Sequence, residues 1–310
     1  EADAGRDLHR PRRVAGGGVA LSGEDASVGE SAWSALASAG TPPGEASREI
    51  VVEAVDASVD AGRLLLSLLG RLDGAGVRTK SSERDLVTEA DVGSERLVVE
   101  RLRRVAPEYA IEAEEETEDA RSDGPRWFLD PLDGTVNFVH GLPMFAVSLA
   151  LYVGPRPLFA VVHAPRMGET FVAAEGCGAW LLQPDAEPVR LQVSGTNALG
   201  DAILATGFPY RRGEVEHSNL ENFGRFFQHV RGLRRMGSAA VDLAYVAAGR
   251  LDGFWELHLS PFDVAAGALL VREAGGEVTD AGGAEDWLRG GQIAASSPGL
   301  LPAIRARIVC

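Results

Sequence analysis

A short run near the middle of the chain contains the residue types that can hold a metal ion and a phosphate. It reads Trp127-Phe-Leu-Asp130-Pro-Leu132-Asp133-Gly134-Thr135. The apolar start is strand-like, and the proline interrupts strand pairing because it has no N–H. Asp130 and Asp133 can then converge around the carbonyl of Leu132, which gives an oxygen-only cage suited to Mg²⁺. The N–H groups of Gly134 and Thr135 can hold a phosphate. By themselves, the same residues can also form an ordinary Asp-Gly turn.

Further carboxylates occur at three other places, and each has a plain structural interpretation. Glu114 and Glu115 lie in a dense acidic run that can be a solvated surface. Asp91 and Asp263 have the spacing of capping-box residues in the first turn of a helix. Taken together the four features favour chemistry, because acids recur at turns or helix starts beside small residues, which let a ligand approach the backbone.

The elements that must position these acids follow from apolar periodicity. Helical spacing predicts helices over 47–72, 88–105, 219–230, 238–249, 261–274 and 299–308. Short β-rich runs predict strands at 127–129, 147–153, 158–163, 169–173 and 179–182, and later at 202–206, 253–257, 277–279 and 292–295. The first strand group is typical of an antiparallel meander, and the alternating second half is typical of a layered α/β lobe.

Composition narrows the class of protein. The chain has 310 residues, a net charge of −15 and two cysteines. The acidic balance would repel nucleic-acid phosphates, so direct nucleic-acid binding is not expected. Two cysteines cannot form a disulfide framework, which favours a reduced, cytoplasmic setting. The longest strongly apolar run, Met144 to Val153, is far short of a membrane span. Residues 1–45 are rich in Gly, Ala, Ser and Arg, and we expect a disordered extension outside the fold.

From about Ile50 to Ile308 the chain resembles the inositol monophosphatase family, whose relatives include fructose-1,6-bisphosphatase and lithium-sensitive nucleotide phosphatases. Four blocks carry the resemblance, in the order of the family. They are Lys80-x4-Asp85-Leu-Val-Thr88-x2-Asp91, then Glu114-Glu115, then the run from Trp127 to Phe138, and finally Gly237-Ser-Ala-Ala240 with Phe262-Asp263-x-Ala-Ala-Gly-x5-Glu273-Ala-Gly-Gly276.

The resemblance implies a role for each residue at the matching positions. Two or three Mg²⁺ ions would be bound by Glu114, Asp130, the Leu132 carbonyl, Asp133 and Asp263. Catalysis would use Asp91 and Thr135, which orient and deprotonate the attacking water, and Glu115, which supports a metal-bound water. The substrate would contact Asp133, Gly134, Thr135, Ala239, Glu256 and Asp263.

Three positions depart from the family's usual pattern. Phe262 stands where a tryptophan usually precedes the last metal aspartate. The acidic block usually reads Gly-Glu-Glu-Ser, whereas here Glu114, Glu115 and Glu116 follow Ala113. Three consecutive glutamates leave open, by one residue, which of them is the ligand. Val136 replaces a common threonine.

The fold that the resemblance implies is a mixed α/β (α+β) chain in a layered αβαβα sandwich. We expect an N-terminal α+β lobe over 46–195, a C-terminal α/β lobe over 196–310, and the metal site between them. The expected activity is Mg²⁺-dependent, Li⁺-sensitive hydrolysis of phosphate monoesters, foremost inositol monophosphates, by a homodimer. Fructose-1,6-bisphosphate, histidinol phosphate and a 3′-phosphonucleotide are alternative substrates. A non-catalytic regulatory protein of the same fold is the alternative from another class.

Overall fold

Two β-sheets form the framework of the chain. The computed structural model describes residues 27–71, 77–79, 86–120, 124–210 and 213–310. Lys80 and Asp85 of the first sequence block lie outside these residues, as does 1–26 of the expected extension. The seven-stranded sheet has the order β3-β4-β5-β6-β7-β8-β9 and is antiparallel apart from the β3–β4 pair. Its strands are β3 Ala110–Ala113, β4 Pro125–Asp133, β5 Ala146–Val153, β6 Arg156–Ala164, β7 Glu169–Ala174, β8 Ala179–Leu182 and β9 Val189–Arg190.

The second sheet is smaller and mixed. It has the order β11-β10-β12-β14-β13, with β10 parallel to both its neighbours and β14 antiparallel to β12 and β13. Its strands are β10 Ile203–Thr206, β11 Gly232–Arg234, β12 Gly253–Leu257, β13 Glu277–Thr279 and β14 Gln292–Ser296. A separate hairpin pairs β1 Val77–Thr79 with β2 Leu86–Thr88.

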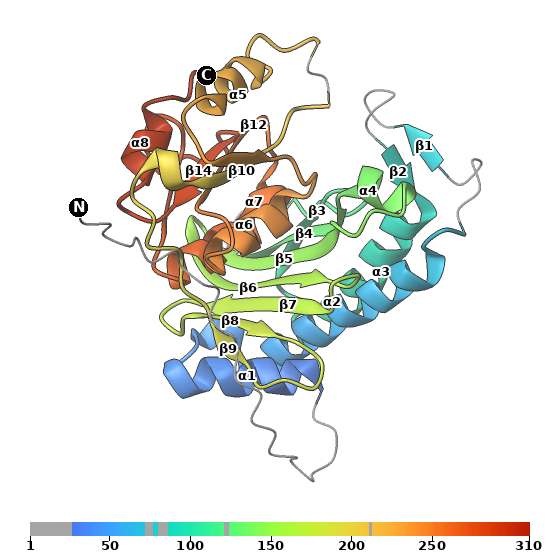
Figure 1. The fold of residues 1–310 in the computed structure, drawn as a ribbon. Coiled ribbons are helices and arrows are strands. Elements are labelled where there is room, and N and C mark those ends of the chain that lie inside the picture. Colours follow the sequence, from blue (N-terminus) through green and yellow to red (C-terminus); the bar gives the residue numbers. More distant parts are fainter. Residues whose placement is uncertain (1–26, 72–76, 80–85, 121–123, 211–212) are drawn as a thin grey trace.

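Helices cover both faces of each sheet, which gives the five layers αβαβα (Figure 1). Helices α1 Val28–Ala39, α2 Arg48–Leu68 and α3 Glu89–Val105 pack on one face of the large sheet. The central layer, α6 Ala239–Ala247 and α7 Pro261–Glu273, lies between the sheets, and α5 Leu220–Phe227 and α8 Leu301–Arg305 pack on the outer face of the small sheet. The expected fold class is confirmed. One sheet lies on each side of the predicted lobe boundary at residue 195.

Alternation along the strands divides the apolar side chains between two cores. In β4, Trp127 and Leu129 face the α1–α3 layer, whereas Phe128 faces the central helices. In β5, Leu149 and Leu151 likewise face the first core and Ala150 faces the second. Both faces of these strands are apolar because helices cover both, and the strands therefore appear in the sequence as continuous β-rich runs.

The prediction of disorder through residue 45 is wrong for the described part of that segment. Helix α1 occupies Val28–Ala39, and a 3₁₀ turn follows at Gly44–Ala46. Ser27 caps α1 by accepting a hydrogen bond from the N–H of Glu30 at 3.2 Å. Ala32 and Leu36, one turn apart, are fully buried against α2 and the large sheet. Sequence reasoning missed the helix because its buried stripe is made mostly of alanine, which gives little hydrophobic signal.

A half-buried carboxylate explains part of the last sequence block without catalysis. Glu273, at the end of α7, accepts hydrogen bonds from the N–H groups of Gly176 at 2.9 Å and Gly178 at 2.8 Å. It therefore fixes the β7–β8 turn to the central layer. Both glycines have positive φ angles of 73°, a conformation that other residues adopt at a cost.

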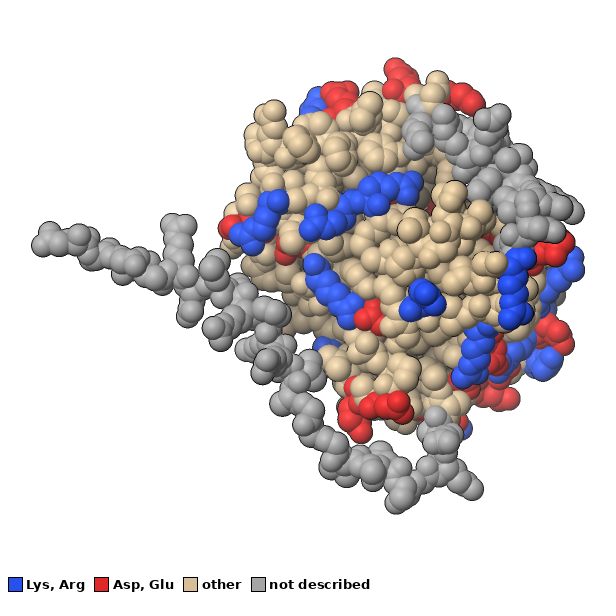
Figure 2. Space-filling view, turned by 45° about the vertical axis from the view of Figure 1, so that its right-hand side comes forward, with Lys and Arg blue, Asp and Glu red and all other residues tan. Residues whose placement is uncertain are grey.

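Charges on the surface are mixed in sign. On the face that Figure 2 shows, basic side chains stand singly or in small groups, and acidic side chains lie beside several of them. Exposed ion pairs such as Arg48–Glu30 at 2.6 Å and Arg225–Glu221 at 2.7 Å each stabilise the fold little. Among the described residues, no helix is long and apolar enough to cross a bilayer.

Candidate active site

The end of strand β4 presents the first two carboxylates. The pairing of β4 with β5 is regular up to Asp130 and resumes at Asp133, with a register shift between them. Pro131 causes the shift, since it cannot donate to the sheet. The freed N–H of Leu132 donates to Asp130 Oδ1 at 3.0 Å. The irregularity turns both aspartates to the same side, which alternating strand geometry would not do for residues three apart.

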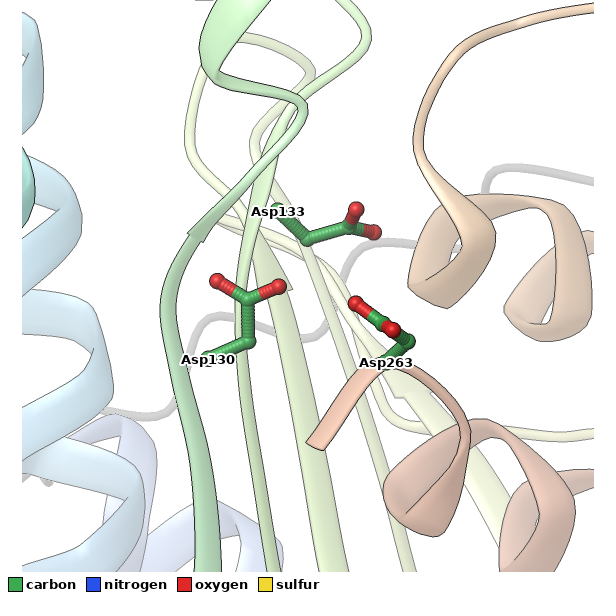
Figure 3. Close-up of side chains that lie close together, drawn as sticks. All are labelled: Asp130, Asp133 and Asp263. Atoms are coloured by element: carbon green, nitrogen blue, oxygen red, sulfur yellow. The ribbon is translucent and has the colours of Figure 1, made fainter. Parts of the chain in front are cut away.

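Asp263 reaches the same place from the start of helix α7. One of its oxygens, Oδ2, caps the helix by accepting the N–H of Ser260 at 2.6 Å. The capping interpretation from the sequence is thus right, and it does not exclude a second role. One carboxylate oxygen from each of Asp130, Asp133 and Asp263 lies within 4.8 Å of the other two. Figure 3 shows the three carboxyl groups turned toward one another, two from β4 and one from α7.

The electrostatics of this three-aspartate cluster favour a cation. Burial, followed by repulsion from Glu114 and the other cluster members, raises the pKa of Asp130 and of Asp263 well above the ordinary range. Burial also raises the pKa of Asp133 to about 6, although hydrogen bonds from Ser238 and the N–H of Ala240 oppose the shift. Carboxylates of like charge held this close keep protons unless a positive ion neutralises them. A divalent cation would therefore relieve the strain of this arrangement.

Asp133 also ties β4 to helix α6. Its Oδ2 accepts the hydroxyl of Ser238 at 2.6 Å and the N–H of Ala240 at 2.7 Å. Ser238 in turn caps α6 by accepting the N–H of Val241. The block Gly237-Ser-Ala-Ala240 is therefore a clamp on a cluster carboxylate. These contacts join residues more than 100 positions apart in the chain.

Thr135 and Asp91 form a hydrogen-bonded pair beside the cluster. The hydroxyl of Thr135 lies 2.9 Å from Asp91 Oδ1 and 3.1 Å from the carbonyl oxygen of Leu132. Asp91 Oδ2 accepts the N–H and the hydroxyl of Thr88, so that Asp91 completes the capping box of α3. Asp91 is only 1% exposed, and burial raises its pKa against the opposing effect of these hydrogen bonds.

Gly134 permits the tight turn that places Thr135. Its φ of 92° lies in the left-handed region. A Cβ atom there would stand 2.8 Å from the carbonyl oxygen of Met144 and 3.2 Å from that of Gly237. Only glycine fits both requirements. Asn137, one turn later in the short helix α4 Thr135–Val139, holds the surrounding loops together by donating to the carbonyls of Met144 and Met236 at 2.6 and 2.8 Å.

The three consecutive glutamates point to different places. Glu114 lines the cleft next to the cluster, and its charge raises the pKa of all three cluster aspartates. Glu116 pairs with Arg96 on the surface at 3.0 Å. The buried Glu95, which sequence reasoning missed, accepts the N–H groups of Glu115 at 2.9 Å and Glu116 at 3.0 Å. Glu95 thereby sets the register of the segment, and no local sequence signal marks it.

A cleft of about 420 Å³ opens beside the cluster. Of the sequence-predicted residues, Glu114, Asp133, Ala239, Glu256 and Asp263 line it. Burial raises the pKa of Glu256 to about 8, with Arg235 opposing the shift. A Cβ on Gly207 would lie 2.1 Å from a Glu256 oxygen, so that this glycine makes room for the carboxyl group. Sequence reasoning missed Arg235 and Asp242, which also line the cleft. Arg235 belongs to a short basic run that looks like surface, and Asp242 lies inside a helix.

Comparison with known proteins gives relatives over nearly the whole described chain. A profile of the inositol monophosphatase family matches residues 47–309. A Pseudomonas aeruginosa protein named Nus factor SuhB is 44% identical over 251 residues, covering 79% of this chain and 90% of that protein. A Rhizobium meliloti protein named inositol-1-monophosphatase is 42% identical over 253 residues, covering 81% and 92%.

Solved structures agree with the sequence relatives. The extragenic suppressor protein suhB from Bartonella henselae superposes with a TM-score of 0.74 at 38% identity, covering 83% of this chain and 97% of that one. The inositol monophosphatase from Anabaena superposes with a TM-score of 0.73 at 36% identity, covering 82% and 93%. Helix α1 lies before the start of the family match.

Proposed function

The chain belongs to the inositol monophosphatase family, and from this premise we propose that it hydrolyses phosphate monoesters with Mg²⁺, with inositol monophosphates as the first choice of substrate. The observation that carries the proposal is the group formed by the buried Asp130 and Asp133 and the half-buried Asp263, in which one oxygen from each residue lies within 4.8 Å of the other two. A cluster of this kind beside a hydrogen-bonded Thr–Asp pair fits metal-assisted hydrolysis.

The donor set fits Mg²⁺ better than softer ions. Asp130, Asp133, Asp263, Glu114 and the Leu132 carbonyl are all oxygen donors, which hard cations prefer. In this proposal these residues would hold two or three Mg²⁺ ions. Bound Mg²⁺ would neutralise phosphate charge, acidify a bound water and stabilise the leaving alkoxide. Glu115 would hold a metal-bound water. The N–H of Glu115 donates to the carboxylate of Glu95, and this hydrogen bond supports a fixed backbone position for Glu115.

The Thr135–Asp91 pair would activate the attacking water. When the Thr135 hydroxyl donates to Asp91 Oδ1, its oxygen keeps lone pairs that can accept a hydrogen bond from water. As the water oxygen bonds to phosphorus, its proton passes to Thr135 and the threonine proton passes to Asp91. The bond from phosphorus to the ester oxygen breaks with its electron pair passing to that oxygen, which takes up a proton from solvent water, and the alcohol leaves. Gly134 and Thr135 would hold the phosphate through their N–H groups.

The cleft would take the leaving alcohol. Ala239, Glu256, Asp133 and Asp263 line it. A carboxyl group that can both donate and accept, as Glu256 can when protonated, suits a hydroxyl-rich ring. The alternative substrates are fructose-1,6-bisphosphate, histidinol phosphate and a 3′-phosphonucleotide.

A panel of small phosphate monoesters tests this proposal. Phosphate release is measured for each compound with Mg²⁺ and with Mg²⁺ removed by a chelator, and kcat/KM values rank the substrates. We expect inositol 1-phosphate to rank first and chelation to abolish release. Another compound in first place would replace the proposed substrate. If no monoester in the panel releases phosphate, the enzymatic proposal is wrong.

The relatives named Nus factor motivate a second candidate function. In this candidate the chain acts as a Nus factor, whether or not it also hydrolyses phosphate. The net charge of −15 argues that any such role works through a protein partner and not through direct nucleic-acid binding. The test uses a bacterial strain that depends on its own relative named Nus factor. That relative is replaced by this chain, either as the wild type or as Asp133→Asn, and growth separates the two roles. Support by both versions favours a Nus-factor role independent of catalysis.

Three further properties belong to the same proposal. The family resemblance suggests a homodimer, inhibition by Li⁺, and a cytoplasmic location. Sedimentation at several protein concentrations tests the first, and the phosphate-release assay with added LiCl tests the second. A monomer at all concentrations, or activity indifferent to Li⁺, would remove that property from the proposal.

A further inference from the structure

Asp242 is the least explained buried acid of the cleft. It lies in the first turn of helix α6, is 1% exposed and lines the cleft. Its Oδ1 atom is sealed from solvent and has no hydrogen-bond partner in the described part of the chain. An acid with an unmade hydrogen bond at such a site destabilises the fold, so that its presence needs a reason.

Three other buried acids among the described residues differ from Asp242 in this respect. Asp133 accepts from Ser238 and Ala240, and Asp91 accepts from Thr88 and Thr135. Glu95 accepts two N–H groups. In each case the donors explain why the carboxyl group can be buried. Asp242 has no comparable structural explanation.

The neighbours of Asp242 are other charged groups that line the cleft. Besides burial, the charges of Glu256 and Asp133 raise its pKa, and that of Arg235 lowers it. Asp242 is not one of the three grouped aspartates Asp130, Asp133 and Asp263. A carboxyl group on the cleft wall that is not needed in that group can accept a hydrogen bond from an O–H or N–H donor that a ligand brings.

We infer that Asp242 accepts a hydrogen bond from a hydroxyl group of the leaving alcohol and is therefore a specificity-determining residue that selects polyhydroxylated leaving groups. This inference rests on the proposed phosphatase function. Together with Glu256 on strand β12, Asp242 provides carboxyl oxygens on the wall of the cleft, and Arg235 offsets part of their charge. An alcohol without additional hydroxyls leaves Asp242 unpaired and gains nothing from it.

The test compares two leaving groups in the Mg²⁺-loaded full chain. Inositol 1-phosphate has several free hydroxyls on its leaving group, whereas 4-nitrophenyl phosphate has none. We expect Asp242→Ala to lower kcat/KM for inositol 1-phosphate by about 10-fold, the upper end of the range for a lost hydrogen bond between neutral groups. The aryl phosphate should lose threefold at most. Asp242→Asn keeps the size and one acceptor oxygen, and should fall between the wild type and Asp242→Ala for inositol 1-phosphate.

Asp252→Ala is the matched control. Asp252 is a partly buried aspartate outside the cleft whose Oδ2 accepts the N–H of Ile203 at 2.6 Å. Its replacement should lower the melting temperature and leave the ratio of the two kcat/KM values unchanged. Asp242→Asn should melt no lower than the wild type, because it keeps the size of the side chain and breaks no hydrogen bond to Oδ1.

The inference is overturned if Asp242→Ala slows both substrates by the same factor, or if inositol 1-phosphate is unaffected. A melting temperature lowered in Asp242→Asn as in Asp252→Ala, with an unchanged substrate ratio, would assign Asp242 a structural role instead. A failure of the proposed function looks different, because the wild type would then release phosphate from neither compound. If Asp242→Ala does not fold, the ratio measured for Asp242→Asn decides.

Discussion

Replacing Thr135 by valine should separate water activation from metal binding. Valine has nearly the shape of threonine but lacks the hydroxyl that links Asp91 Oδ1 to the site at 2.9 Å. The cluster of Asp130, Asp133 and Asp263 is untouched by the change. We therefore expect a loss of kcat with little change in the Mg²⁺ concentration that gives half-maximal activity.

The size of the effect follows from the contacts. Loss of a positioned general base usually lowers the rate by about 10²- to 10⁴-fold, or roughly 3 to 5 kcal/mol of transition-state stabilisation. The fold loses less. Asp91 keeps both contacts from Thr88 to its Oδ2 and loses the partner of its Oδ1, which costs about 1–3 kcal/mol at a buried acceptor.

The assay is a double-mutant cycle. Phosphate release is measured for the wild type, Thr135→Val, Asp91→Asn and the double variant, and urea unfolding gives the stability of each. Thr135→Ser is the control, because it keeps a hydroxyl and should retain most of the activity. If both residues act on one water, the double variant should be scarcely slower than either single variant. If the rate losses of the two single variants multiply in the double variant, Thr135 and Asp91 do not act on the same water.

Three other changes test separate parts of the structure. Asp133→Asn should lower kcat by at least about 100-fold by removing a metal charge, with an unchanged circular dichroism spectrum. Near-normal turnover would show that the site is misassigned. Burial, and then Arg63, lower the pKa of His163 to about 4. The unfolded state binds its proton near pH 6.5, so stability falls as the pH drops from 6.5 to 4, by up to about 3 kcal/mol. Urea titrations should show a flatter pH dependence in His163→Gln, and an equal slope would contradict this. Leu36→Ala should lower the free energy of unfolding by about 2–5 kcal/mol with kcat/KM unchanged, whereas unaltered stability would mean that α1 is not part of the folded core.

Much of the secondary structure was predictable because its causes are local. The strands β5, β6 and β7 showed their apolar runs in sequence, and the capping boxes at Asp91 and Asp263 marked the starts of α3 and α7 within one residue. Short strands were predicted less completely. The three-residue strand β13 was predicted with its bounds, whereas β3 and β11 were missed, since three or four residues are too few to establish a period.

Helix α1 shows where the local signal was insufficient. Its sequence has a capping serine and only small buried residues apart from Leu36. What holds it is its close fit to α2. The N–H of Gly29 donates to Asp56 at 2.8 Å, and a Cβ on Gly29 would stand 2.4 Å from the carbonyl oxygen of Val52. A fit of this kind depends on residues of another helix, as Asp56 lies 27 positions after Gly29, and composition does not reveal it.

The run from Asp130 to Thr135 was identifiable in the sequence because a proline and a glycine beside two aspartates favour a turn of the backbone. The sequence by itself determined those residue types, the helix caps and the strand alternation, since each depends on neighbours within a few positions. Only the tertiary structure decided that Asp263 meets Asp130 and Asp133, that Glu114 faces the cluster while Glu116 faces Arg96, and that Asp242 is left without a partner. The physical reason is that packing between distant segments sets the direction of a side chain and the loss of its hydration. The same carboxylate can cap a helix, pair with a cation or repel its neighbours, depending on which groups the fold brings beside it.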